Sequence, residues 1–360
     1  MKLAVAIPGD LATPTGGYAY DRRIVAELTR RGFAIEVIGL GEGFPQARDD
    51  VRLAAVATVA ARARDCPVVV DGLALGVLPE LAARPRGRLI GLVHHPLALE
   101  TGLPAAAAAA LAASERLALS GAAHVIATSA TTARLLVADY GVPPGRLTVA
   151  PPGTDRVPLA HGSRDGVPAL IAVGSLVPRK GYDVLVAALA TIADLPWRLT
   201  VVGDATRDPA TAAAIAADVA RRGMADRIVL AGAVGADQLA ALYRAADLFV
   251  LASRFEGYGM AYAEAIAYGL PVVGTRAGAI PDTVGSAAVL VGPDDVPALG
   301  EALRALVGDR DRRAHMAAAA RAAAAGLPTW DDAADLVARA VEAVGAQAPE
   351  GAQAPRVVVT

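Results

Sequence analysis

The 360 residues of this chain include a single cysteine, Cys66, so no disulfide can form within it, which fits a reducing compartment. Charge of one sign is also missing, because 34 Lys and Arg residues meet 36 Asp and Glu residues and leave a net charge of -2. A nucleic-acid partner would be expected to select a basic face. The balance gives no reason to expect attraction to an anionic membrane surface either.

Long uninterrupted apolar runs are missing as well. Charged residues interrupt each long apolar stretch, so we predict no transmembrane helix, and the apolar run at residues 3–8 is too short for a signal peptide. Aromatic residues make up only 4% of the chain, whereas hydrophobic residues make up 54%. We therefore expect a globular, cytoplasmic protein whose core is built mainly from small aliphatic side chains.

What the sequence does contain is a regular alternation of short apolar runs and longer helical stretches, such as Tyr18 to Arg31, Asp183 to Ile192 and Ala236 to Ala245. The runs are rich in β-branched residues and nearly continuous, which is typical of parallel strands buried on both faces. This pattern predicts an α/β fold with Rossmann-like, doubly wound parallel sheets. The expected strands are Leu3 to Pro8, Ala34 to Gly39, Pro67 to Asp71, Leu89 to Val93, His124 to Thr128, Leu147 to Ala150, Ala169 to Gly174, Arg198 to Gly203, Ile228 to Ala231, Leu248 to Leu251 and Pro271 to Gly274.

Two domains are expected, since a chain of this length exceeds what one hydrophobic core usually supports. The Pro- and Gly-containing segment 151–155 and the polar segment 161–166 separate two series of strands and mark the linker. We predict an N-terminal domain at 1–155 and a C-terminal domain at 156–326. Residues 346–360 repeat Gly-Ala-Gln-Ala-Pro without a packing pattern and are expected to form a flexible tail.

Several motifs lie at the carboxyl ends of the expected strands, where doubly wound domains bind their ligands. The pair Gly16-Gly17 opens a helix, so backbone there can approach an anion closely. The cations Arg179 and Lys180 follow the strand that ends at Gly174 and suit a diphosphate, whose charge must be neutralised. A plain turn and a solvated basic pair are the structural alternatives, but the position of the cations favours function.

The segment 254–264 carries two carboxylates, with Glu256 in the loop after a strand and Glu264 about two turns into the next helix. In a fully helical segment they would lie roughly 12 Å apart, so one could accept hydroxyls from a sugar and the other from a ribose. Gly257 and Gly259 leave backbone N–H groups free to reach hydroxyl or phosphate oxygens. Spacing alone would still favour two exposed glutamates without a function.

A histidine pair, His94-His95, ends another expected strand, and Glu100 follows in the same loop. Side chains alternate along a strand, so one of the two rings is expected to face the cleft. A lone histidine is more often structural, but a pair at the carboxyl end of a strand favours function. His95 and Glu100 are expected as contacts to an acceptor or a sugar.

With these motifs the sequence resembles the retaining GT-B glycosyltransferases of family 4, over residues 1 to 345. The resemblance implies two facing Rossmann-like domains, the first on the acceptor side and the second binding a nucleotide sugar, with 327–345 as a helix that crosses back to the first domain. The residues that carry it are Gly16, Gly17, Val125 to Ser129, Arg179, Lys180, Glu256 and Glu264.

The resemblance also implies a role for each motif in holding a nucleotide diphosphate sugar. The Arg-Lys pair would hold the diphosphate, and the glycine pair would approach it from the opposite domain. Glu256 and His94 would contact the donor sugar, Glu264 the ribose, and Val234 the base. The residues expected in catalysis are Arg179, Lys180, His94 and Glu256. The residues expected to bind the donor are Gly16, Gly17, Gly174, Val234, Glu256, Gly257, Tyr258, Gly259, Met260 and Glu264.

Two departures weaken any transfer of donor identity. The usual Asn-Gly-Val-Asp linker reads Pro152 to Asp155 here, and a common Gly-Gly-x-Pro-Glu element reads Gly278 to Asp282. The base, the sugar and the oligomeric state stay open, and a glycan, a small molecule or a lipid-linked sugar could be the acceptor. We expect no metal or other cofactor, because we recognise no Asp-x-Asp element of the metal-dependent transferases in the sequence.

Two other functions remain compatible with the residues. One is a nucleotide-sugar epimerase of similar architecture, which would interconvert free sugar nucleotide without an acceptor. The other is a non-catalytic protein that binds a sugar nucleotide without turnover. A nicotinamide-dependent dehydrogenase is disfavoured, since the Gly-x-Gly-x-x-Gly turn is missing after the first expected strand.

Overall fold

The computed structural model describes residues 1–83 and 87–346 and contains two parallel sheets of six strands each. Their strand orders are β2-β1-β3-β4-β5-β6 and β12-β11-β10-β7-β8-β9. This is the predicted fold class. The first sheet comprises β1 (Lys2–Ile7), β2 (Ala34–Gly39), β3 (Val68–Asp71), β4 (Leu89–Val93), β5 (His124–Ala127) and β6 (Leu147–Val149). The second comprises β7 (Ala169–Val173), β8 (Arg198–Val202), β9 (Ile228–Leu230), β10 (Leu248–Val250), β11 (Val272–Thr275) and β12 (Ala288–Val291).

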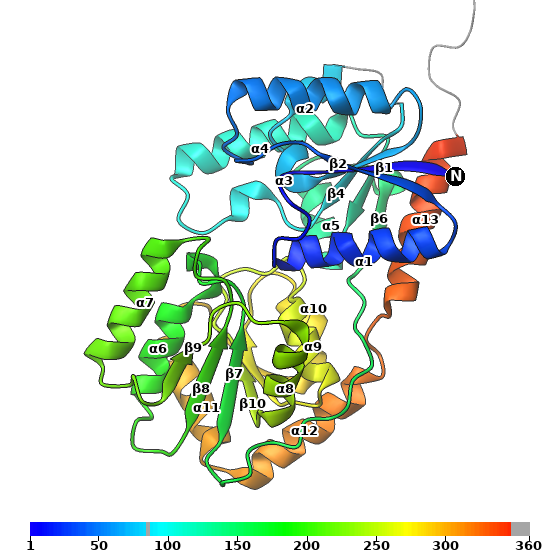
Figure 1. The fold of residues 1–360 in the computed structure, drawn as a ribbon. Helices are drawn as coiled ribbons and strands as arrows, with labels where there is room; N and C mark the ends of the chain where they lie inside the picture. The colour runs from blue at the N-terminus through cyan, green and yellow to red at the C-terminus, as the bar shows by residue number, and fades with distance from the viewer. Residues whose placement is uncertain (84–86, 347–360) are drawn as a thin grey trace, which may run out of the picture.

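Helices connect successive strands and pack around the sheets, so that each half forms a layered α/β unit (Figure 1). In the first half the helices are α1 (Gly16–Arg30), α2 (Asp49–Arg62), α3 (Gly72–Leu75), α4 (Ala105–Ser120) and α5 (Ala130–Ala138). In the second half they are α6 (Tyr182–Ala190), α7 (Pro209–Arg221), α8 (Ala236–Ala245), α9 (Met260–Ala267), α10 (Ile280–Val284), α11 (Val296–Val307) and α12 (Arg310–Ala324). The last described helix is α13 (Trp330–Ala346).

Burial on both faces explains why the strands of the first sheet are continuous apolar runs. All residues of β3 and β4 are buried, so no polar residue needs to alternate with the apolar ones. One face packs against α1 and α13 through residues such as Tyr20 and Val341. The opposite face packs against α2, α4 and α5 through residues such as Val56, Leu119 and Leu136.

Helix α13 follows the second half in sequence but packs on the first half in space (Figure 1). Its first residue, Trp330, has its ring centroid 6.0 Å from that of Tyr20 in α1. The chain returns to the first half next to the segment by which it left, since Thr154 N donates to Pro328 O at 2.8 Å. A Cβ on Gly153 would lie only 2.1 Å from the Trp330 nitrogen, so this crossing needs glycine. The two halves are thus joined by two adjacent crossings.

Three local differences from the sequence expectation have physical reasons. Helix α1 begins at Gly16, two residues earlier than expected, because the Thr15 hydroxyl caps it by accepting from Tyr18 N. The edge strand β12 was not expected, because its short run is only partly buried, with Val291 alone fully inside. Ala346 ends α13, and the rest of the predicted tail lies outside the described residues.

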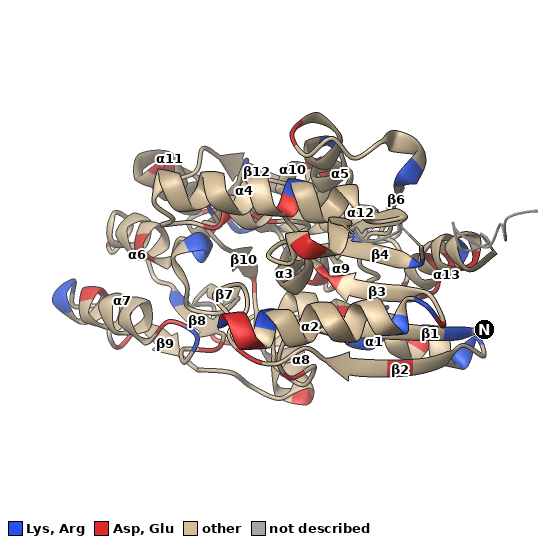
Figure 2. Cartoon of the chain, turned by 90° about the horizontal axis from the view of Figure 1, so that it is seen from above, with Lys and Arg blue, Asp and Glu red and all other residues tan. Residues whose placement is uncertain are grey.

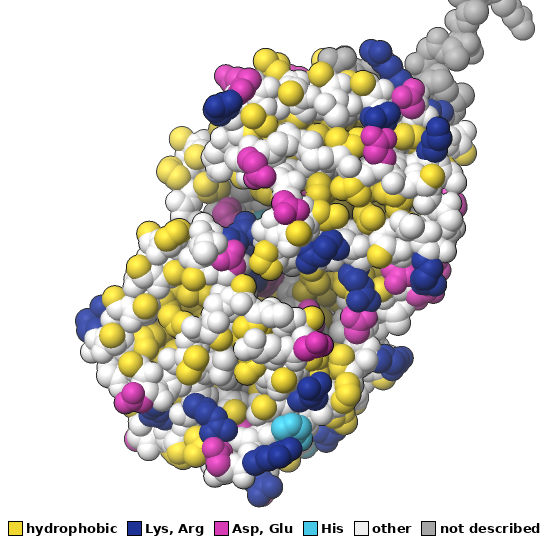
Figure 3. Space-filling view, viewed as in Figure 1, with side chains coloured by type: hydrophobic (Ala, Val, Ile, Leu, Met, Phe, Trp, Pro, Cys, Tyr) yellow, Lys and Arg dark blue, Asp and Glu magenta, His cyan; other side chains and the backbone are white. Residues whose placement is uncertain are grey.

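Basic and acidic residues are interspersed along both halves of the chain, as the low net charge predicts (Figure 2). The space-filling view shows the surface hollowed between the halves, with side chains of both signs along its rim (Figure 3). Within residues 1–83 and 87–346, none of the helices is both long enough and apolar enough to cross a bilayer.

Candidate active site

The carboxyl ends of neighbouring strands decide which side chains meet on each side of the hollow. In the second sheet β7 and β10 are adjacent, so the loop carrying Arg179 and Lys180 lies beside the loop carrying Glu256. In the first sheet β1, β3 and β4 are adjacent, so the start of α1 lies beside Asp71 and His94. Both groups of polar residues therefore form where parallel sheets usually bind ligands.

The cation pair of the second half surrounds the buried carboxylate of Glu256. Lys180 Nζ lies 2.6 Å from Glu256 Oε1, and Arg179 Nη1 lies 3.4 Å from Oε2. The Ser253 hydroxyl donates to Oε1 at 2.7 Å. Burial alone would raise the pKa of Glu256, but attraction to Lys180 and Arg179 outweighs it and lowers that pKa. Glu256 is therefore an anion inside a positive environment.

Arg254 holds the turn that carries these two cations. Arg254 N donates to Arg179 O at 2.8 Å, and Arg254 Nη1 donates to Pro178 O at 2.6 Å. The same guanidinium pairs with Asp183 at 2.6 Å and with Asp294 at 2.7 Å. The 3₁₀ turn Pro178–Lys180 is thus fixed from outside, which leaves both cationic side chains directed at the loop of Glu256.

Glu100 reaches across from the first half to the same cations. Its carboxylate accepts from Arg179 Nε at 3.2 Å and lies 3.5 Å from His95 Nε2. Burial acts to raise the pKa of Glu100, but the bond to His95 and the charge of Arg179 lower it to about 2. Because 43% of the Glu100 side chain is exposed, this bridge is open to exchange with a competing anion.

His94 lies between two buried carboxylates of the first half. Its Nε2 atom is 3.3 Å from Asp21 Oδ1 and 3.5 Å from Asp71 Oδ2. Burial alone would lower the pKa of His94, but attraction to Asp21 and Asp71 outweighs it and raises that pKa. The three atoms also lie close enough together for one metal ion to bridge them.

The glycines of both halves allow the loops to approach closely. A Cβ on Gly16 would lie 3.7 Å from Met260 Sδ in α9, and one on Gly17 would lie 3.3 Å from the His94 ring. A Cβ on Gly257 would lie 2.0 Å from His94 O, which no larger residue could accept in this arrangement. The expected glycine loop, His94 and the start of α9 therefore do meet.

Glu264 lies in the second turn of α9, not deeper, because the helix begins only at Met260. Its Oε2 accepts from the Tyr243 hydroxyl at 3.1 Å. Burial raises the pKa of Glu264 to about 7, against the lowering effect of the bond from Tyr243. Gly259 precedes the helix with φ 96°, a left-handed conformation that glycine adopts without strain.

The remaining expected donor contacts are spread along the same edge. A Cβ on Gly174 would lie 3.0 Å from Lys180 Cε, so the lysine side chain runs over this glycine. Tyr258 follows the Glu256 loop, and its carbonyl accepts from Thr283 Oγ1 at 2.5 Å. Val234 is half-buried in the loop after β9, which is two strands away from β7 and therefore at the outer end of the row of loops.

Sequence reasoning missed Asp21 and Asp71. Asp71 ends β3 directly after three valines, so its place at a strand's carboxyl end was a readable signal. Asp21 sits on the buried face of α1 beside Ile24 and Leu28, and a charge on an apolar helix face is the signal there. The sequence analysis also passed over the triplet Asp309 to Asp311, which follows a helix; Asp309 caps α12 by accepting from Arg312 N.

Contacts between the halves also include Asp282, which stands where a glutamate is common. Its Oδ2 accepts from Thr131 Oγ1 at 2.8 Å and from Arg134 Nη2 at 2.9 Å, both in α5. Thr132 Oγ1 donates to Gly257 O at 3.3 Å. The departure noted in the sequence thus lies at the contact between the halves.

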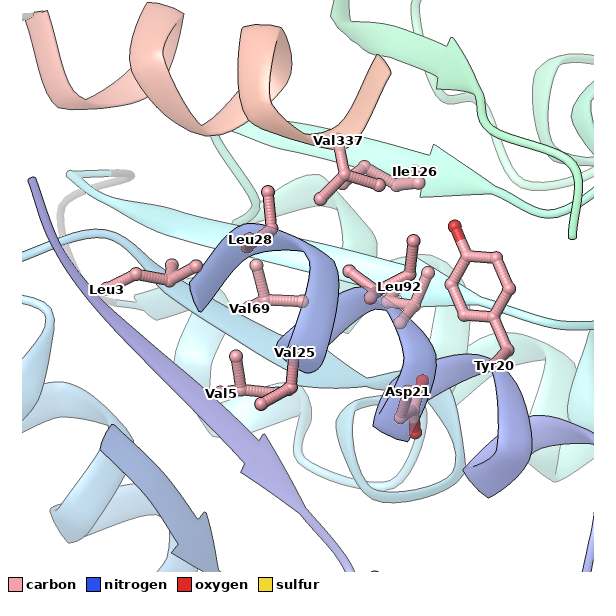
Figure 4. A pocket seen from close by; sticks show the side chains of 11 residues that line it. Leu3, Val5, Tyr20, Asp21, Val25, Leu28, Val69, Leu92, Ile126 and Val337 are labelled. Carbon is pink, nitrogen blue, oxygen red and sulfur yellow. The ribbon is translucent and has the colours of Figure 1, made fainter. Parts of the chain in front are cut away.

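A small pocket of the first half lies behind the His94 cluster, with Tyr20 and Asp21 in its lining. It lies between α1 and the first sheet, lined by side chains such as Leu28, Val69 and Leu92 (Figure 4). Its volume is about 10 Å³, which is room for a single water at most. This pocket is therefore too small for a substrate.

Comparison with known proteins gives two family matches and many related chains. Residues 16–157 match the model described as Glycosyltransferase Family 4, and residues 167–309 match the one described as Glycosyl transferases group 1. The D-inositol 3-phosphate glycosyltransferase 1 of Catenulispora acidiphila is 32% identical over 289 residues, which is 72% of this chain and 68% of that protein. Against several other curated relatives the match spans about half of their length, for example 54% and 49%.

Solved structures share the fold at low sequence identity. Sucrose-phosphate synthase from Thermosynechococcus elongatus aligns with a TM-score of 0.79 at 20% identity, covering 95% of this chain and 99% of that one. Anabaena Alr3699/HepE in complex with UDP and glucose aligns with a TM-score of 0.71 at 20% identity, covering 94% and 99%. At these identities the likenesses show the shared fold.

Proposed function

The chain belongs to glycosyltransferase family 4, the glycosyl transferases group 1, and from this premise we propose that it moves a hexose-type sugar from a nucleotide diphosphate sugar to an acceptor hydroxyl, with retention of configuration. The observation that carries the proposal is the pair of Arg179 and Lys180 around Glu256, directly opposite His94 and Gly17. Two cations at a strand end suit a diphosphate, and a facing half closes over the sugar.

Each part of the donor has a partner in this arrangement. The diphosphate takes the place of Glu100 at Arg179, since the Glu100 side chain is 43% exposed and a phosphate oxygen could replace its carboxylate. The backbone at Gly16 and Gly17 approaches the same phosphates from the first half at the N-terminus of α1. The ribose hydroxyls donate to Glu264, and the base lies toward Val234 at the outer end of the loops.

The chemistry follows from where charge develops. As the bond between the sugar and the diphosphate breaks, negative charge grows on the leaving oxygen, and Lys180 and Arg179 are positioned to stabilise it. Positive charge grows on the sugar at the same time, close to the carboxylate of Glu256. In this proposal the side chains supply the stabilising charge, so a metal is not needed.

Retention follows if the acceptor enters on the face that the diphosphate leaves. The departing phosphate oxygen then takes the acceptor proton while the new bond forms to the same face of the sugar. The acceptor approaches from the first half, near His95 and Glu100. Contacts such as Thr132 to Gly257 hold the halves together and exclude water, which limits hydrolysis of the donor.

The first experiment is a thermal-shift panel of UDP-, GDP- and ADP-sugars on the wild type and on Glu264→Ala. A ligand at a hundredfold excess over Kd stabilises the folded state by about 2.7 kcal/mol, which is easily measured. A shift for one nucleotide that is lost in Glu264→Ala supports the donor site and names the base. The order of testing follows the names of similar proteins, with UDP-glucose as the first donor and D-inositol 3-phosphate as the first acceptor.

Turnover assays then separate transfer from the other two functions. Product formed only with an acceptor supports a transferase, and the anomeric coupling in the product's NMR spectrum reports retention. Interconversion of free sugar nucleotide without an acceptor supports an epimerase instead. Binding without turnover for all acceptors tried contradicts the proposal and leaves a non-catalytic role.

A further inference from the structure

The cluster of Asp21, Asp71 and His94 places two buried carboxylates around one imidazole. The carboxylate side chains are only 1% and 4% exposed. Both oxygens of Asp21 are buried without a hydrogen-bond partner among the described residues, and so is His94 Nε2. The second carboxylate, Asp71, uses Oδ1 to accept from Leu73 N at 2.7 Å, which leaves Oδ2 facing the ring.

Two buried carboxylates are costly unless a positive group compensates them. Within the described part of the chain, His94 is the basic side chain in ion-pair range of both. A neutral ring could offer one N–H to them and would leave a bare nitrogen on its other side. A protonated ring offers its N–H to the carboxylates and still carries a second N–H.

Among the described residues, His94 Nε2 is buried without a hydrogen-bond partner, whereas the second ring nitrogen, Nδ1, is not one of these buried unpaired atoms. The backbone of Gly17 approaches the ring along its Cδ2–Nε2 edge, where a Cβ would lie 3.3 and 3.4 Å away. Because Nε2 is buried, the 21% of the side chain that remains exposed belongs to its other atoms. The Tyr20 ring packs against the His94 ring at nearly a right angle, with 5.4 Å between their centroids.

We propose that Asp21 and Asp71 are positioning residues that hold His94 as an imidazolium, whose free Nδ1–H donates a hydrogen bond to a hydroxyl or phosphate oxygen of the donor. The other titratable groups beside the ring are Tyr20 from α1 and the neighbouring His95. Neither supplies an anion that would replace the two carboxylates. Attraction to Asp21 and Asp71 raises the pKa of His94 against the effect of burial, while burial raises the pKa of Asp21 to about 6, so Asp21 is still ionised beside the ring at pH 8.

Which donor oxygen His94 contacts rests on the proposed function, but the protonation of the His94 ring does not. The two can therefore fail separately. A metal ion held by the same three atoms is the competing explanation, and it excludes a proton on Nε2 because both need the same lone pair.

The test is NMR of the full chain labelled with ¹⁵N in the histidine rings, with His94→Gln used only to assign the signal. We expect His94 in the wild type to show the imidazolium pattern, with both ring nitrogens protonated, at pH 8. In Asp71→Asn its midpoint should fall by about 1 to 3 pH units, as expected for the loss of one neighbouring opposite charge. A wild-type ring that is neutral at pH 8 overturns the proposal.

Two controls separate the possible outcomes. Asp247→Asn removes a carboxylate in the second half, which accepts from Ala169 N at 2.8 Å, and should leave the His94 signal unchanged. Bound metal in equimolar amount, or a His94 signal that changes on dialysis against EDTA, overturns the imidazolium in favour of the metal. If Asp71→Asn does not fold, the wild-type spectrum alone still decides.

Activity gives a second readout once a donor is known. We expect kcat/KM for the donor in Asp71→Asn to fall more steeply than in the wild type between pH 7 and 9, as the variant ring loses its proton. Equal profiles for the two proteins contradict the role of the Nδ1–H. A loss of activity that is the same at each pH would indicate a structural role for Asp71 only.

Discussion

The two sides of the hollow carry ionic clusters of opposite composition. In the second half, two cations surround one buried carboxylate, Glu256. In the first half, two buried carboxylates surround one imidazole, His94. The cation-rich cluster has an anionic partner, Glu100, which is part exposed and comes from the other half. The anion-rich cluster is closed, because its carboxylates are buried behind the ring.

This difference predicts how a donor is oriented between the two clusters. A surplus of positive charge with a replaceable partner favours an incoming anion, so the diphosphate is expected on the second side. A buried surplus of negative charge holds a protonated ring, which in the arrangement we propose donates a hydrogen bond to the donor. In that proposal both clusters orient the same donor molecule.

Removing a cation from the second side is expected to have the largest effect. Lys180→Ala should lower kcat on the order of 10² to 10³, as the loss of one charge-stabilising donor does in other sites, and should raise the donor KM less. The chain's other lysine is Lys2, so Lys2→Ala is the matched control and should keep wild-type kinetics. Steady-state kinetics decide the point, and an unchanged kcat in Lys180→Ala removes the assigned role.

The second largest effect is expected from a substitution that pushes the two clusters apart. Gly257→Ala places a Cβ 2.0 Å from His94 O, so the loop must move by an ångström or more. Displacement of that size costs on the order of 10² in kcat/KM. Gly145→Ala is the control, since nothing lies within 4 Å of a Cβ there. Wild-type kinetics in Gly257→Ala, with normal thermal unfolding, would show that the halves need not meet in this way.

A smaller effect is expected from pH on donor affinity. Glu264 accepts ribose hydroxyls best as a carboxylate, and its pKa is raised to about 7 by burial. Affinity should therefore be full above pH 7 and fall roughly tenfold for each unit below it. Calorimetric titration between pH 5.5 and 8.5 measures this, and Glu264→Gln should bind weakly with little dependence on pH. A wild-type affinity that stays flat from pH 8 to 6 contradicts the ribose role.

Through Glu264, the folding stability should change with pH in the direction opposite to that of the donor affinity. The pKa of Glu264 is raised in the folded chain above its ordinary value of 4.5, so its contribution is fully present below pH 4.5. That contribution is lost as the pH rises through about 7. Without donor, the melting temperature of Glu264→Gln should therefore gain on that of the wild type between pH 5 and 7.5.

The comparison also shows how far the sequence reaches. The strands other than β12, and the row of loops, were predictable, since runs such as Val68 to Val70 are typical of buried strands and parallel strands share one edge. Which side chains pair across that edge was not. That Glu100 would bridge to Arg179 depends on how two halves meet, and no local pattern encodes that. Asp21 was hidden because helical periodicity treats a charge as marking the solvent side.

The smallest effect, and the finest test of the comparison, is expected at Glu100. Glu100→Gln removes the anion that occupies Arg179, so the donor no longer has to displace it. An exposed ion pair is worth about 0.2 to 1 kcal/mol, so the donor Kd should fall by about 1.5- to 5-fold. Glu80→Gln, which removes an exposed carboxylate paired with Arg52 at 3.0 Å elsewhere in the first half, is the control. If Glu100→Gln weakens donor binding or raises only the acceptor KM, Glu100 is a substrate contact, as the sequence predicted. Arg179 would then need no anionic partner from the first half when no donor is bound.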